Sequence, residues 1–140
     1  MLTGDIRNQV DRIWDAFWTG GISNPLEVIE QLTYLLFIKR LDDIHSLELS
    51  RLKQLGDGKR IFDDAQEHYR WSVFKNREPS EMYHIIADEV FPFIREMGKG
   101  LDTTFARHMK DARFTLPPEK AGLLSKVVEL LSNINMDDRD

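Results

Sequence analysis

The stretch NPLEVIEQLTYLLFIKRLDDIHSLELSRLKQL, residues 24–55, decides the fold of this chain. Its first residues predict a helix start. Asn24 can cap free backbone N–H groups, Pro25 suits the first helical position, and Glu27 can reach back to the cap. The segment from Leu32 to Leu41 is apolar on almost every side, which predicts a helix surrounded by protein rather than one lying on a surface.

Beyond Leu41 a single apolar stripe continues among charged residues, and Gly56-Asp57-Gly58 ends the helix. A helix of this length spans roughly 45 Å at about 1.5 Å per residue. Other elements must then pack around its middle. We therefore expect an all-α fold, a multi-helix bundle built around one long central helix at about residues 24–55.

Helical spacing of apolar residues predicts four further helices. The first runs to about Trp18, and its short loop to the long helix predicts an αα-hairpin. Another begins with Ser80 as its N-cap, and Pro92 should kink or divide it. A short one lies between Leu101 and Phe114, and the last is opened by residues 117–119. The apolar residues expected to face inward from the helix that begins at Ser80 are Met82, Ile85, Ile86, Val90, Phe93, Ile94 and Met97.

The segment from Gly56 to Pro79 is an irregular insert that carries aromatic residues. Residues 63–69 can hold a short helical turn. Arg70 to Phe74 alternates aromatic and polar residues, and two interpretations remain open for it. The segment is either extended or a loop that Trp71 and Phe74 fix to the core.

Composition places the chain among ordinary globular proteins. It has 140 residues, 41% hydrophobic and 31% charged, which fits one helical domain over residues 1–140. It has no cysteine, so disulfides and thiolate metal sites are excluded and a cytoplasmic setting is expected. The longest apolar run is too short for a membrane span. The net charge of −5 argues mildly against a chain that binds nucleic acid over its whole surface.

The sequence contains no catalytic, cofactor-binding or metal-binding pattern. Glycine-rich phosphate loops are absent, and the four histidines never take the spacing of a metal site. Asp42-Asp43 and Asp63-Asp64 are pairs of carboxylates, but sequence neighbours on a helix point apart. We therefore expect both pairs to lie on solvated faces.

Basic residues gather in two places. Lys59 and Arg60 follow the long helix, and Arg107, Lys110 and Arg113 lie together further along the chain. Such clusters can hold DNA phosphates, or they can be ordinary solvated surface. The aromatic side chains of the insert can likewise stack on a base or anchor their loop to the core.

Several segments of the chain resemble one protein family. They are Ile13-Trp14-Asp15-Ala16-Phe17-Trp18, PLEVIEQLTYLLFIKRLDD at residues 25–43, Arg70-Trp71-Ser72 with Phe74, and residues 124–135. Together they resemble the N-terminal helical domain of the modification (methyltransferase) subunit of type I restriction–modification systems. The resemblance covers roughly residues 6–136, and its most specific part is residues 32–43.

The resemblance implies a fragment of a larger subunit, without the catalytic domain. In that family the following domain binds S-adenosylmethionine and methylates the N6 amino group of adenine. The helical domain would help clamp double-stranded DNA and assemble with the specificity subunit and a second modification subunit. No catalytic residue is carried over, and Lys59, Arg60, Arg107, Lys110 and Arg113 are candidates for DNA contact by charge alone. The alternative is a domain that binds only proteins, through exposed aromatic residues such as Trp71.

Overall fold

The computed structural model describes residues 4–99 and 104–134, and these residues form helices and loops without any strand. The elements in chain order are α1 (Gly4–Thr19), α2 (Pro25–Leu55), η1 (Asp64–Tyr69), α3 (Trp71–Phe74), α4 (Pro79–His84), η2 (Ile85–Val90), α5 (Phe91–Lys99), α6 (Thr104–Lys110), η3 (Pro118–Lys120) and α7 (Ala121–Ser132). Of the three η elements, η1 and η3 are 3-10 helices and η2 is a π-helix. The predicted all-α class is confirmed.

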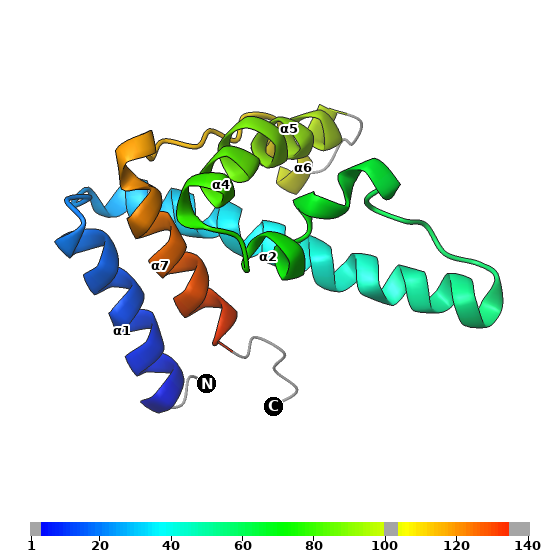
Figure 1. Ribbon diagram of the computed structural model, residues 1–140, viewed down its shortest axis with the longest axis horizontal. Coiled ribbons are helices and arrows are strands. Elements are labelled where there is room, and N and C mark those ends of the chain that lie inside the picture. Colours follow the sequence, from blue (N-terminus) through cyan, green and yellow to red (C-terminus); the bar gives the residue numbers. More distant parts are fainter. Residues whose placement is uncertain (1–3, 100–103, 135–140) are drawn as a thin grey trace.

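The longest element is α2, a helix of 31 residues that extends across most of the molecule (Figure 1). Its two ends lie where the sequence predicts them, although the Glu27 side chain bonds to Thr115 and not to the cap. The Asn24 side chain accepts a hydrogen bond from the Leu26 N–H at 3.0 Å. At the other end Gly56 adopts φ +70°, a left-handed conformation that glycine tolerates, and its N–H bonds to the Leu52 carbonyl.

One face of α2 is buried. Its buried residues are Val28, Gln31, Tyr34, Leu35, Ile38, Leu41, Asp42 and His45. Thr33 and Arg40 are exposed, and Leu32 is only partly covered. Every apolar residue from Leu32 to Leu41 is nevertheless buried or partly buried against the core. The prediction that protein surrounds this part of the helix on almost every side is therefore confirmed, and the two exposed positions carry polar side chains.

The first helix does not form a hairpin with α2. Instead α1 lies antiparallel beside α7, while α2 runs across them (Figure 1). The contact is close, because a Cβ added at Gly20 would lie 2.8 Å from the Leu123 side chain. Gly21, at φ +93°, turns the chain away at this point. The predicted αα-hairpin is therefore wrong, and the apolar face of α7 supplies the partner instead.

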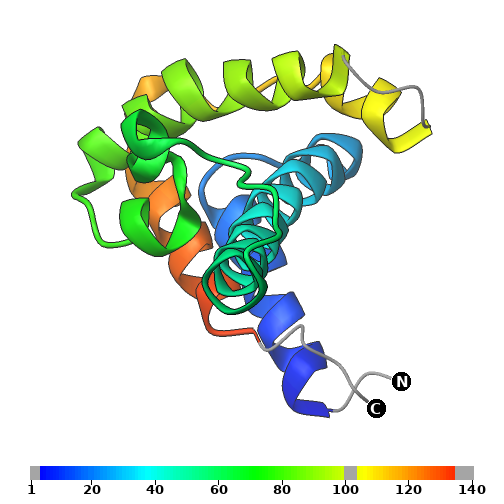
Figure 2. The same cartoon turned by 90° about the vertical axis from the view of Figure 1, so that its right-hand side faces the viewer.

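Residues 79–99 form one helical run that arches over the side of α2 opposite α1 (Figure 2). Its N-cap is Glu78, with Pro79 in the first turn, so the prediction of Ser80 as the cap is wrong. The run is divided as predicted near Pro92, but by a π turn. The Phe91 N–H bonds to the Ile86 carbonyl, five residues back.

The π turn changes which residues of this run face the core. It adds one residue to a turn, so the following helix is rotated by about 100° relative to a continuous α-helix. Phe91 and Ile94 are consequently buried at 0% exposure, and Phe93 and Met97 are only partly buried. The inward positions predicted before Pro92 are confirmed, and so is Ile94 after it, whereas Phe93 and Met97 lie at the edge of the core.

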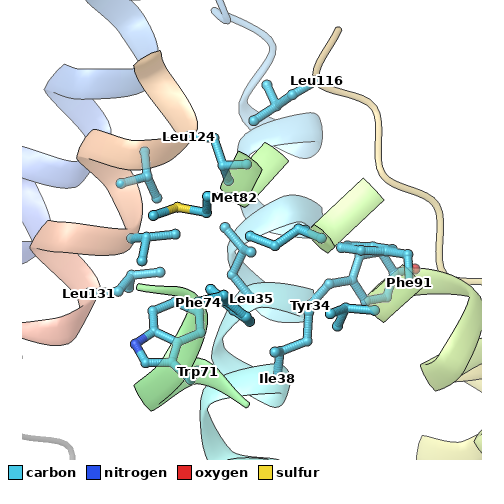
Figure 3. Packing of buried hydrophobic residues seen from close by; sticks show 14 of the residues in the cluster. Tyr34, Leu35, Ile38, Trp71, Phe74, Met82, Phe91, Leu116, Leu124 and Leu131 are labelled. Carbon is cyan, nitrogen blue, oxygen red and sulfur yellow. The ribbon is translucent and has the colours of Figure 1, made fainter. Parts of the chain in front are cut away.

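The aromatic insert is anchored to the core. Residues 71–74 form a single helical turn instead of an extended segment. Trp71 and Phe74 point inward between α2 and α7, near Leu35 and Leu131 (Figure 3). The interpretation of a loop fixed by two aromatic anchors is confirmed.

The buried face of the last helix, α7, is the one that its apolar spacing predicts. Its buried residues are Leu124, Val127, Val128 and Leu131, and Ile134 just beyond it is buried as well. The short helix predicted between Leu101 and Phe114 is α6, although Leu101 itself lies outside the described residues.

Candidate nucleic-acid interface

The helix that carries Arg107 and Lys110, α6, is packed tightly against its neighbour in the fold. α6 packs against α5 with close backbone contact, because a Cβ added at Gly98 would meet the Ala106 carbonyl and the Lys110 nitrogen at 2.6 Å. Ala106 and Met109 are buried on this side. Arg107 and Lys110 therefore point away from α5 and are exposed.

The chain after α6 is fastened to α2 by a buried amide. Gln31, at 0% exposure, donates from Nε2 to the Arg113 carbonyl at 2.9 Å and accepts from the Thr115 N–H at 3.3 Å. The Thr115 hydroxyl also donates to Glu27 at 2.9 Å. The backbone of Arg113 is thus fixed, while its side chain remains exposed.

A ring contact adds a second connection between α6 and α2. His108 stacks on Tyr34 with ring centroids 5.3 Å apart and planes 24° from parallel. Tyr34 in turn meets Phe91 edge to face at 5.7 Å. Burial and the nearby charges of Glu30 and Asp111 raise the pKa of Tyr34, so its hydroxyl stays neutral at physiological pH.

The charges of this cluster are not neutralised within the described part of the chain. Arg107, Lys110 and Arg113 form no ion pair with any described residue, although acidic Glu30 and Asp111 lie in the same region. We call these three basic residues the α6 cluster. It offers several free donors for an anion on a fixed segment.

Lys59 and Arg60 lie elsewhere. The Lys59 N–H donates to Glu48 at 2.6 Å, and the Arg60 side chain pairs with Asp64 at 2.9 Å. Their attachment point on α2 lies 17 residues beyond Gln31, a separation of roughly 26 Å along the helix. The structure therefore does not bring the two predicted basic groups together, and one of the five charges is already paired.

Asp42 departs most clearly from the sequence prediction. It is only 6% exposed, whereas its neighbour Asp43 is exposed, so the expectation of a solvated pair is wrong for Asp42. Its carboxylate accepts hydrogen bonds from the Arg70 Nε and from the Ser72 N–H, the latter at 2.9 Å. The Trp71 indole donates to Ser132 on α7 at 2.9 Å. Residues 70–72 thus join α2 to α7.

These contacts define the roles of the aromatic residues. Trp71 is 3% exposed and Phe74 0%, so neither presents a face on which a base can stack. The expectation that Trp71 is an exposed contact for another protein is also wrong. The exposed tryptophan is instead Trp18, at 67%, on α1.

Two further features of the described residues concern other kinds of site. They contain no group of three or more metal-binding side chains, and none of their helices is long and apolar enough to cross a membrane. An open groove of about 530 Å³ lies between α1 and α7. Its lining residues include Arg12, Asp15, Leu123 and Lys126.

Comparison with known proteins gives one match. The model of the family described as "HsdM N-terminal domain" matches residues 6–131. No curated protein and no solved structure matches the chain. The family model covers most of the sequence, including both Asp42 and the Arg70-Trp71-Ser72 segment. The chain therefore belongs to the HsdM N-terminal domain family, the N-terminal domain of the modification subunits of type I restriction–modification systems.

Proposed function

We propose that this domain contributes to DNA binding in a type I modification subunit, through phosphate contacts made by the α6 cluster. The observation that carries the proposal is that Arg107, Lys110 and Arg113 are exposed, pair with none of the described carboxylates, and lie on a segment fixed to α2. A cation without a partner can bind a phosphate directly, whereas a cation already paired must first give up its partner. Lys59 and Arg60 are weaker candidates, since Arg60 is paired.

The chemistry of methyl transfer belongs to another part of the subunit in this proposal. S-adenosylmethionine would bind there, and the adenine N6 amino group would be methylated there. The helical domain would supply backbone contacts, which position DNA but carry no sequence information. Target choice would then rest with the specificity subunit.

The test is charge reversal in the assembled complex of modification and specificity subunits. The variant Arg107→Glu/Lys110→Glu should weaken DNA binding. The slope of log affinity against log salt should fall by about 0.9 for each lost phosphate contact, or about 1.8 for two. The matched control is Arg7→Glu/Arg12→Glu on α1, which changes net charge equally at two exposed positions.

An unchanged salt slope in the α6 variant would refute the assignment of DNA contact to these residues. Equal losses in both variants would show that only net charge matters. The α6 cluster would then have no specific role.

A second function, binding of a partner protein, is favoured by a different surface. Around the loop between α1 and α2, Trp18, Leu26 and Ile29 are 67%, 76% and 51% exposed. The exposed carboxylates of Asp15 and Glu30 lie in the same segments. Exposed apolar side chains suit a protein partner better than the phosphate backbone of DNA.

We propose that this surface takes part in assembly with the specificity subunit or a second modification subunit. Trp18→Ala should reduce assembly, measured by analytical ultracentrifugation of the mixed subunits, and leave the salt slope of DNA binding unchanged. Leu47→Ala is the control, because Leu47 is 60% exposed near the other end of α2. Assembly unaffected by Trp18→Ala would exclude this tryptophan from the interface.

A further inference from the structure

His45 occupies an unusual position on the buried face of α2. It is 0% exposed, and its Nδ1 accepts hydrogen bonds from the backbone N–H groups of Ile61 at 3.1 Å and Phe62 at 3.3 Å. A ring nitrogen that accepts carries no proton, so the neutral ring holds its proton on Nε2. That nitrogen has no hydrogen-bond partner among the described residues.

Core packing alone gives no reason for a histidine here. A buried N–H without an acceptor costs about 1–3 kcal/mol, a penalty that an apolar side chain would not carry. The useful atom is therefore Nδ1, which satisfies two backbone N–H groups of the chain as it returns from the end of α2. Together with the bond from the Lys59 N–H to Glu48, His45 ties this returning chain to the helix.

We propose that His45 is a positioning residue that acts as a proton-operated latch on residues 59–62. With the ring neutral, the segment lies against α2. When a proton from solvent binds Nδ1, the lone pair that both N–H groups share is lost, and they then face a buried cation. The segment must separate from α2 so that the imidazolium can reach water.

The charged groups around His45 do not stabilise its protonated ring in the closed state. The groups that act on it are Arg70, Glu67, Arg60 and Asp42. Both carboxylates are already committed to Arg70, Asp42 through Nε and Glu67 at 3.1 Å. No free carboxylate remains among these groups to neutralise an imidazolium.

The direction of the pH dependence follows from the same contacts. Burial, and then the charge of Arg70, lower the pKa of His45 in the closed state below its ordinary value. The open state titrates near that ordinary value, about 6.5. Closure is therefore fully favoured above about pH 6.5 and is weakened progressively as the pH falls below it. As the pH falls from about 7.5 to about 5.5 the open fraction should rise, by no more than about tenfold.

The experiment is NMR-detected hydrogen exchange in the 140-residue chain. The protection factors of the Ile61 and Phe62 amides, corrected for the intrinsic pH dependence of exchange, should fall over that range, by no more than about tenfold. In His45→Asn the amide oxygen takes the place of Nδ1 and does not titrate, so protection should persist at both pH values. His84→Asn, at an exposed histidine on α4, should behave like the unsubstituted chain.

Two results would overturn the latch. One is equal protection at both pH values in the unsubstituted chain. The other is the same loss of protection in His45→Asn, since that variant has no proton to gain. A further test uses the unsubstituted chain alone. The ring nitrogen shifts of His45 at neutral pH must show Nε2 protonated and Nδ1 bare, and the reverse tautomer would exclude the mechanism. The latch does not depend on the proposed DNA contact.

Discussion

The Asp42→Ala substitution tests whether the contacts between α2 and residues 70–72 hold the fold together. Alanine would leave the Ser72 N–H without an acceptor and remove the carboxylate that bonds to the Arg70 Nε. The Arg70 side chain is only 15% exposed, so water cannot readily replace that partner.

The expected loss of stability follows from these contacts. Removing one member of a buried ion pair costs about 3–5 kcal/mol. Arg70 would retain bonds to Glu67 at 3.1 Å and Ser46 at 2.8 Å, which places the loss near the bottom of that range. A domain of this kind is stable by about 5–15 kcal/mol, so a loss of about 3 kcal/mol should clearly lower its urea midpoint.

The assay is urea unfolding at neutral pH, followed by far-ultraviolet circular dichroism. Asp43→Ala is the matched control, because Asp43 is the exposed neighbour on the same helix. It should change the free energy of unfolding by no more than about 0.5 kcal/mol. If both variants lost the same stability, or neither lost any, the structural role given to Asp42 would be refuted.

The same contact predicts how the difference changes with pH. Burial alone would raise the pKa of Asp42, but hydrogen bonds from Arg70 and Ser72 outweigh it and hold the pKa below its ordinary value. The contribution of this carboxylate is therefore fully present above about pH 4 and is lost as the pH falls further. The stability difference between the unsubstituted chain and Asp42→Ala should narrow below about pH 4.

Two other predictions concern the helix contacts. Gly98→Ala should destabilise the domain by about 1–3 kcal/mol, because the added Cβ would meet backbone atoms of α6 at 2.6 Å. Gly122→Ala, where nothing lies within 4 Å, should instead stabilise it by about 0.5–1 kcal/mol; thermal unfolding distinguishes the two signs. Trp71→Phe should cost about 1 kcal/mol through loss of the hydrogen bond to Ser132. In a double-mutant cycle with Ser132→Ala, additive losses would show that this bond contributes nothing.

The parts of the fold that local chemistry controls could be predicted from the sequence. The caps of α2 lie within a residue or two of the ends they fix, and the apolar spacing of α7 identifies its buried face. The pairing of α1 with α7 could not be predicted, because it joins segments about 100 residues apart. The π turn before Pro92 could not be predicted either. The backbone geometry of this turn, and not the pattern of apolar residues, determines which side of α5 faces the core.

The candidate site could be predicted only as a set of charges. The sequence grouped Arg107, Lys110 and Arg113, but it could not show that Gln31 fixes the segment carrying Arg113 or that Arg60 is paired with Asp64. Asp42 and Asp43 show the same limit. Adjacent carboxylates are chemically alike, and only the position of Arg70 in space makes one of them part of the core.

The residues that carry the resemblance to the family include some with a structural role. Asp42 and Trp71 are buried, and the contacts of Asp42 and residues 70–72 join α2, the insert and α7. The α6 cluster lies outside, on a segment held to α2 by Gln31 and Tyr34. Membership of the family consequently accounts for the helical scaffold but says nothing of which exposed cations contact a phosphate. That question depends on charge and exposure in this chain, which is why charge reversal on α6, with its matched control on α1, decides it.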